Sequence, residues 1–130
     1  MTLEKLQSEY PDLDKYKDDR GNVFYYKKDT KIYHNPYGPA IITRDKTLEY
    51  RIQYDLHRLD GPARIYPDGD IEYWINNKNL GNSKQKFYNN IKKLKSKNIN
   101  KQDKINILNI KNLLLDGLNN DSLSLLKSSL

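Results

Sequence analysis

The side chains best suited to acid–base or metal chemistry are two histidines, His34 and His57, which lie 23 residues apart. Each precedes a Gly-Pro-Ala segment at the same distance, so a catalytic or metal-binding role would have to arise twice in the same geometry. We therefore expect both histidines to be structural. In the second segment we expect His57 to hydrogen-bond a neighbouring turn carbonyl, and Asp60 to cap the turn at Gly61 through its carboxylate.

The other residue types that support catalysis or cofactor binding do not form a recognisable site. The chain has no cysteine, which excludes a disulfide, a thiol nucleophile and a thiolate zinc site. Asp60, Asp68 and Asp70 lack the spacing of a calcium loop. The C-terminal serines have no nearby histidine, and neither a Gly-x-Ser-x-Gly motif nor a Gly-rich phosphate loop occurs. The sequence predicts a protein that is not an enzyme and has no cofactor, bound metal or small-molecule ligand.

An internal repeat places these residues in equivalent positions. The stretch HNPYGPAII at 34–42 recurs as HRLDGPARI at 57–65, and the same offset relates 45–52 to 68–75. A partial earlier copy at 20–26 matches 68–74 and implies a two-residue change of length before His34. Alternation of apolar and polar residues around a tight turn predicts one β-hairpin in each unit, and stacked hairpins would form one antiparallel meander. The repeat-turn residues are His34, Gly38, Pro39, His57, Asp60, Gly61, Pro62 and Gly69.

These repeat residues resemble MORN-type repeats, in particular the MORN-like variant of bacterial antitoxin-type and giant-virus proteins. The second unit carries the pattern in His57-Arg58, in Asp60-Gly61-Pro62-Ala63, in Asp68-Gly69 and in Trp74. The first unit departs from it, with Tyr37, Lys46 and Arg51 in place of the Asp, the turn Gly and the Trp. The resemblance covers about residues 20–81 and implies a scaffold or docking surface rather than one activity.

Charge and composition both change near Gly81. Residues 1–81 carry 13 Lys and Arg against 14 Asp and Glu, whereas residues 82–130 carry 10 Lys against 3 Asp. Ser83 can cap a basic amphipathic helix that runs to about Lys97. We predict an α+β fold. It consists of an arm over 1–19 with a helix at about 3–10, a Tyr-rich antiparallel β-hairpin meander of MORN-like repeats over 20–81, and a basic, Leu-rich segment of two or three helices over 82–130.

The function predicted from these features is a non-enzymatic interaction or assembly module. Its helical tail would dock on a protein partner or on a second copy of the chain, through the apolar residues Ile107, Ile110, Leu114, Leu118, Leu123 and Leu126. Packing of the same residues on the sheet is an equal alternative. The alternative function is sequence-nonspecific binding of nucleic acid by the Lys-rich helix at 84–104. Contacts to phosphate or to an acidic partner would come from Lys92, Lys93, Lys95 and Lys97.

The sequence also bears on where the protein works. The N-terminal residues lack the apolar core of a signal peptide, and the longest aliphatic run is three leucines at 113–115. We therefore expect an intracellular protein without a membrane partner, in the cytoplasm or within a virus-infected cell or virion. The joint abundance of Lys, Asn and Ile is typical of an AT-rich genome, such as that of a giant virus, a phage or some bacteria.

Overall fold

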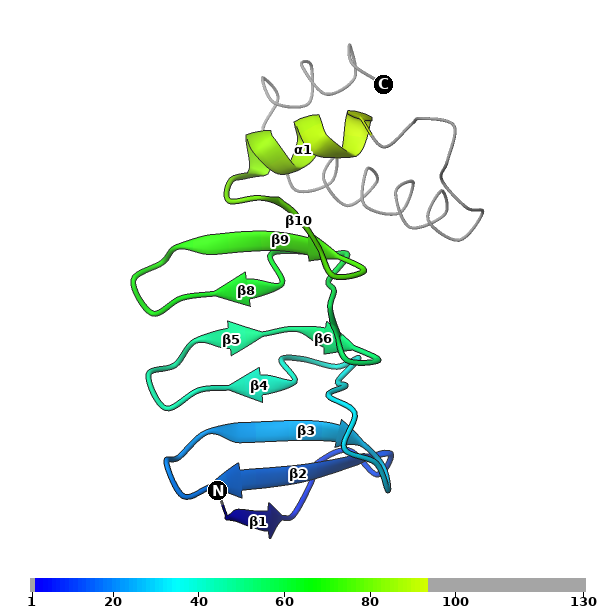
Figure 1. Ribbon diagram of the computed structural model, residues 1–130, viewed down its shortest axis with the longest axis vertical. Helices are drawn as coiled ribbons and strands as arrows, with labels where there is room; N and C mark the ends of the chain where they lie inside the picture. Colours follow the sequence, from blue (N-terminus) through cyan, green and yellow to red (C-terminus); the bar gives the residue numbers. More distant parts are fainter. Residues whose placement is uncertain (1, 94–130) are drawn as a thin grey trace.

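The computed structural model describes residues 2–93, which form a column of antiparallel β-hairpins with a helix at its C-terminal end (Figure 1). Eight strands form one sheet in the order β1-β2-β3-β4-β5-β8-β9-β10, and β6 pairs with β7 beside it. The predicted antiparallel meander is therefore confirmed. The elements are β1 (Leu3–Leu6), β2 (Leu13–Asp18), β3 (Val23–Lys27), β4 (Ile41–Ile42), β5 (Leu48–Glu49), β6 (Arg51–Ile52), β7 (Asp55–Leu56), β8 (Arg64–Ile65), β9 (Ile71–Ile75), β10 (Lys78–Gly81) and α1 (Lys84–Lys93).

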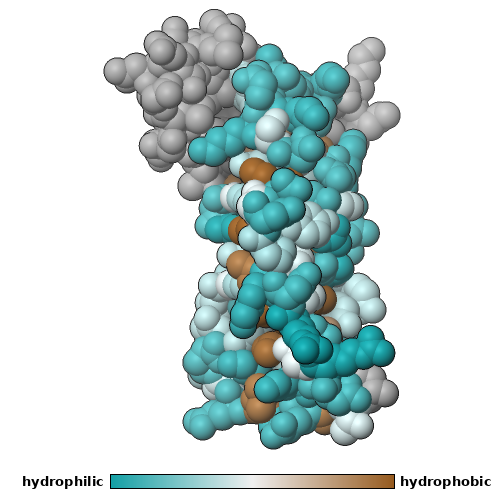
Figure 2. Space-filling view, turned by 90° about the vertical axis from the view of Figure 1, so that its left-hand side faces the viewer, coloured by the Kyte–Doolittle hydropathy of each residue, from teal (hydrophilic) through white to brown (hydrophobic). Residues whose placement is uncertain are grey.

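The internal repeat appears in the structure as three turns with the same hydrogen bonds. They connect β2 to β3, β4 to β5 and β8 to β9. In each turn of four residues, the amide of the last residue donates to the carbonyl of the first: Gly21 to Asp18, Lys46 to Thr43 and Gly69 to Tyr66. All three donors have positive φ, of 91°, 74° and 95°. Figure 2 shows the side of the column that carries these turns, where hydrophilic residues predominate and hydrophobic residues form separate patches.

Lys46 is the one member of this set that is not a glycine, so its left-handed backbone is strained. Replacing Lys46 with Gly is expected to raise the free energy of unfolding by about 0.5 kcal/mol, because the strain removed exceeds the entropy that glycine adds to the unfolded chain. Chemical denaturation measures the change. Lys46→Ala is the matched control, since alanine keeps the strain and should bring no gain. A Gly variant less stable than the Ala variant would contradict this reasoning.

A second set of turns explains the two-residue change of length between units. Gln53 and Tyr54 connect β6 to β7, and Asn76 and Asn77 connect β9 to β10, with positive φ at all four residues. Two-residue turns of this kind match the twist of antiparallel strands. In the first unit the connection after β3 is longer, because Lys27 donates its amide to the carbonyl five residues later, at Ile32. The predicted length change therefore lies in residues 28–31.

The helix predicted at about 3–10 is wrong. Leu3–Leu6 instead forms the edge strand β1, and its register with β2 runs from Leu3 opposite Asp18 to Leu6 opposite Lys15. A helix of eight residues gains little without tertiary contacts, whereas the strand pairs with the backbone groups of β2. Leu3 also packs on a cluster of Phe24, Tyr26 and Ile41. The sheet therefore begins before residue 20, and an arm over residues 1–19 does not exist as a separate element.

Helix α1 closes the other end of the column, and its first turn is capped as predicted. The hydroxyl of Ser83 accepts a hydrogen bond from the amide of Lys86 at 3.2 Å. Phe87 and Ile91 are buried, in one cluster with Tyr73, Ile75 and Leu80 of the sheet. The compositional change at Gly81 is therefore not a break in packing. The part of the predicted helix from Leu94 to Lys97 lies outside the described residues. The second and third predicted helices lie outside them as well.

Candidate functional site

The two histidines make equivalent structural contacts. The Nδ1 atom of His34 accepts a hydrogen bond from the amide of Gln53, and Nδ1 of His57 accepts one from the amide of Asn76, both at 3.0 Å. Both donors are the first residues of the two-residue turns. Each histidine therefore satisfies a turn amide 19 residues later in the chain. The contact that we observe for His57 is with an amide donor, whereas the sequence prediction proposed a carbonyl acceptor.

The Nδ1 contact makes the neutral form of His34 the one compatible with the fold. Burial, together with the positive charge of Lys27, lowers the pKa of His34 below its ordinary value of 6.5. Below about pH 6.5 the unfolded chain therefore binds more protons than the folded chain. The contribution of neutral His34 to the free energy of unfolding is complete above this pH. It is lost as the pH falls towards the pKa that His34 has in the folded chain.

We expect the free energy of unfolding to decrease between about pH 7 and about pH 5. Chemical denaturation across this range measures it. His34→Asn is the matched variant, because an amide oxygen accepts the same hydrogen bond and does not titrate. Its stability should depend less on pH than that of the wild type, and the same pH profile in both proteins would contradict the role of His34.

The loop at 57–62 is held together by Arg58, which the sequence prediction did not identify as a structural residue. Its Nε donates to Oδ1 of Asp60 at 2.8 Å, its Nη1 donates to the carbonyl of Pro62 at 3.1 Å, and its guanidinium lies 3.9 Å from the ring centre of Tyr50. Asp60 therefore binds Arg58, and the prediction that its carboxylate caps the turn is wrong. In the preceding loop, Asn35 plays the corresponding role by donating to the carbonyl of Pro39.

Glycine is favoured at position 61 for a different reason from the one that an Asp-Gly turn indicates. Its φ is not positive, but a Cβ atom there would lie 2.9 Å from Cζ of Arg58. Gly38, at the same position of the preceding loop, has its nearest such neighbour at 3.9 Å, in Asn35. The guanidinium of Arg58 therefore occupies the space that a side chain at Gly61 would need.

We expect Gly61→Ala to cost about 1–2 kcal/mol, because the displaced Arg58 side chain loses its contacts with the loop. In an Arg58→Ala background the same substitution should cost much less, which a double-mutant cycle measures. Gly38→Ala is the matched control and should be nearly neutral. An unchanged cost of Gly61→Ala in the Arg58→Ala background would contradict this explanation.

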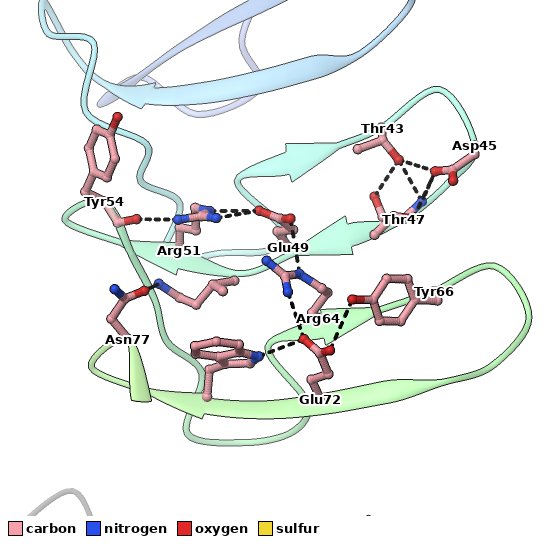
Figure 3. A network of polar contacts seen from close by, with 12 residues as sticks. Thr43, Asp45, Thr47, Glu49, Arg51, Tyr54, Arg64, Tyr66, Glu72 and Asn77 are labelled. Carbon is pink, nitrogen blue, oxygen red and sulfur yellow. Dashed lines mark hydrogen bonds and ion pairs between the residues drawn. The ribbon is translucent and has the colours of Figure 1, made fainter. Parts of the chain in front are cut away.

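A ladder of ion pairs joins the second and third units on one face of the sheet (Figure 3). Glu49 binds Arg51 at 2.8 Å and Arg64 at 3.2 Å, and Arg64 also binds Glu72 at 2.8 Å. The indole of Trp74 donates to Glu72 at 2.9 Å. Burial opposes ionisation of Glu72, but the hydrogen bonds that it accepts hold its pKa below the usual range. The ladder binds strands to one another and leaves no carboxylate set apart for proton transfer.

A groove lies between the loops at 34–38 and 57–60. It encloses about 460 Å³, which is within the range of about 300–1,000 Å³ typical of ligand pockets. Tyr37 is 57% exposed. The lining residues are Asn35, Pro36, Tyr37, Gly38, Tyr50, Ile52, His57, Arg58, Leu59 and Asp60. Three repeat-turn residues predicted from the sequence, Gly38, His57 and Asp60, therefore meet here. Pro39, Gly61 and Pro62 complete the loops, whereas Gly69 lies in the hairpin turn between β8 and β9.

Tyr37 and Asn35 were not predicted as site residues, although the sequence contains a signal for them. Tyr37 departs from the Asp of the repeat pattern, and Asn35 replaces its Arg. Such departures from the repeat pattern mark the positions where one unit differs from the next. At these positions the surface between two units carries different side chains. We regard the groove as the candidate functional site.

The predicted lysine and leucine sites are described only in part. Lys93 is exposed at the end of α1, and the ammonium of Lys92 lies 4.8 Å from the ring centre of Tyr88. Lys95 and Lys97 lie outside the described residues, as do the predicted docking residues Ile107, Ile110, Leu114, Leu118, Leu123 and Leu126.

Within residues 2–93, no three His, Asp or Glu side chains come together in a way that could hold a metal ion. No helix in this part of the chain has the length and apolar character needed to cross a membrane. Comparison of the whole chain with protein-family models, with curated proteins and with solved structures found no match. The resemblance to MORN-like repeats therefore stays a prediction from the sequence.

Proposed function

We propose that this protein is a non-enzymatic interaction or assembly module, in which the β-hairpin column is a scaffold that presents a docking surface to a protein partner. The observation that carries this proposal is the groove between the loops at 34–38 and 57–60. Its walls combine exposed aromatic surface with an Arg–Asp pair, a composition typical of protein-binding surfaces. The side chains capable of acid–base chemistry nearby are engaged in structural hydrogen bonds.

Binding of nucleic acid is the second candidate. It is supported by α1, which buries Phe87 and Ile91 and exposes Lys84, Lys86 and Lys93. Lysines in the last turn also have a purely structural benefit, because cations there interact favourably with the helix dipole. The sheet itself is nearly neutral, since residues 1–81 carry 13 basic and 14 acidic side chains. The charge of the sheet therefore favours a protein partner.

The two candidates are separated by affinity capture on the full-length chain, followed by mass spectrometry, with and without nuclease and at increasing salt. A docking module should keep a stoichiometric protein complex after nuclease treatment and at moderate salt. Contacts with phosphate should instead weaken steeply as salt rises, because they depend on counterion release. A chain that retains no protein in any of these conditions, and that sediments as a monomer, would overturn the proposal.

Charge reversal adds a matched comparison. Lys92→Glu with Lys93→Glu should abolish retention on nucleic acid if α1 binds phosphate. Lys17→Glu with Lys28→Glu makes the same change of net charge at exposed positions near the other end of the column. Loss of nucleic-acid binding in the first variant alone would favour the second candidate over the docking module.

A further inference from the structure

The three repeat units differ in what fills the space between their loops. The turn residues Gly21, Lys46 and Gly69 are equivalent in the three units. Eleven residues before each of them, a first loop position holds Tyr10, Asn35 and Arg58 in turn. Two residues later, a second loop position holds Asp12, Tyr37 and Asp60. These two positions face the space between successive units, so their side chains decide whether that space is filled.

Between the first and second units, aromatic rings of the chain itself fill the space. The ring of Tyr10 stacks on that of Tyr37, with 4.7 Å between ring centres, and lies 5.9 Å from that of Tyr25. The hydroxyl of Tyr37 donates to Oδ2 of Asp12 at 3.0 Å. This arrangement shows what such a space accepts: a stacked tyrosine whose hydroxyl is held by a loop carboxylate.

Between the second and third units, the chain supplies neither ring. At the position of Tyr10 stands Asn35, whose amide side chain binds its own loop by donating to the carbonyl of Pro39 and accepting from the amide of Tyr37. At the position of Tyr37 stands Asp60. The groove of about 460 Å³ lies here. It is the same kind of space without counterparts of the stacked rings of Tyr10 and Tyr37, although Tyr37 and Tyr50 line its walls.

The walls of the groove carry the contacts that a tyrosine needs. Tyr37, which stacks on Tyr10, also lines the groove and can extend the stack by one more ring. The guanidinium of Arg58, which covers Tyr50, offers a planar cation to an aromatic face. Asp60 uses Oδ1 for Arg58, and its Oδ2 has no hydrogen-bond partner among the described residues. Oδ2 can therefore accept a hydroxyl hydrogen bond, as Oδ2 of Asp12 does.

We propose that this groove binds a tyrosine side chain presented by a protein partner. The ring stacks on Tyr37 and the hydroxyl donates to Asp60. This inference rests on the proposed function as a docking module, and it names the chemistry that the partner must present.

The test is a titration of the isotope-labelled full-length chain, followed by amide NMR shifts, with three probes: N-acetyltyrosinamide, N-acetylphenylalaninamide and N-acetylleucinamide. Saturating shifts should be confined to residues 35–38 and 57–61. Tyrosinamide should bind about fivefold more tightly than phenylalaninamide, as expected for one hydrogen bond to a carboxylate. Leucinamide should bind most weakly. No saturating shift with any probe, shifts centred elsewhere, or equal binding of leucinamide would overturn the inference.

Asp60→Asn tests the hydrogen bond, and Asp12→Asn is its control, because Asp12 holds the same loop position in the first unit and does not line the groove. Asp60→Asn should reduce the affinity for tyrosinamide about fivefold and leave that for phenylalaninamide unchanged. The substitution is safe for the fold, because the side chain of Asp60 is 65% exposed. Asp12→Asn should change neither affinity. An equal effect of the two variants would contradict a specific role for Asp60.

The outcome for the groove is separable from that for the module. If capture yields a protein complex that Tyr37→Ala and Asp60→Asn leave intact, and tyrosinamide does not bind, the module stands and the groove is not its contact. If tyrosinamide binds as expected and the captured complex is lost in both variants, the groove is the docking site.

Discussion

Replacing Phe87 with alanine is expected to lower the free energy of unfolding by about 3–5 kcal/mol, a large part of the 5–15 kcal/mol typical of a small domain. The ring is 1% exposed and stacks on that of Tyr73 in β9, with 4.2 Å between ring centres and an interplanar angle of 11°. Removing it leaves a cavity between α1 and the last hairpin. The helix and the sheet should therefore unfold together.

The measurement is equilibrium denaturation followed by the fluorescence of Trp74, the single tryptophan, which lies in β9 next to Tyr73. Gln85→Ala is the control, because Gln85 is on the same helix but exposed, and it should change stability by less than about 0.5 kcal/mol. A Phe87→Ala variant within 1 kcal/mol of the wild type would show that α1 packs on the sheet without stabilising it.

The hairpin units could be predicted because their signals are local. Alternation at 48–52 and 71–75 predicted strands, and the Asp-Gly at 68–69 predicted the tight turn that Gly69 makes with positive φ. The match of residues 20–26 to 68–74 correctly located a third, equivalent turn. Each of these features depends on residues within about five positions of one another, where the sequence pattern constrains the backbone directly.

The errors concern contacts between residues far apart in the sequence. Leu3 and Leu6 have a spacing that suits a helix, and only the presence of β2, with its open edge, makes them a strand. The preference for glycine at position 61 comes from the position of the Arg58 side chain, which the Asp-Gly pattern does not reveal. The groove could have been predicted by extending the repeat back to Tyr10 and comparing Tyr10 with Asn35. That comparison was missed because the two residues align only across a change of loop length.

The change of composition at Gly81 predicts a boundary between the sheet and a separate helical region. The charge does change there, but the packing does not. The side chain of Asn90 in α1 donates to the carbonyl of Leu80 in β10 at 2.9 Å, and Ile91 is fully buried against the sheet. A change of composition indicates which side chains a segment exposes to solvent. The apolar side chains on one face of that segment determine which element it packs against.

Replacing Gly81 with alanine is expected to cost about 3 kcal/mol, because two effects add at this residue. Its φ of 119° is one that side chains rarely adopt, and a Cβ atom there would lie 2.7 Å from Cβ of Lys86 and 3.2 Å from the backbone nitrogen of Phe87. The first turn of α1 would have to move away from β10, and with it the ring of Phe87.

Gly69→Ala separates these two effects, because Gly69 has a φ of 95° but no neighbour within 4 Å of the added Cβ. It should show the backbone strain alone, about 1–2 kcal/mol. Thermal or chemical denaturation of both variants gives the difference, which reports how tightly α1 is held against the sheet. Equal costs in the two variants would mean that the first turn of α1 shifts freely, and that the helix is not a fixed end of the column. A markedly larger cost for Gly81→Ala would establish Gly81 as the residue whose missing side chain allows the column to end in a helix.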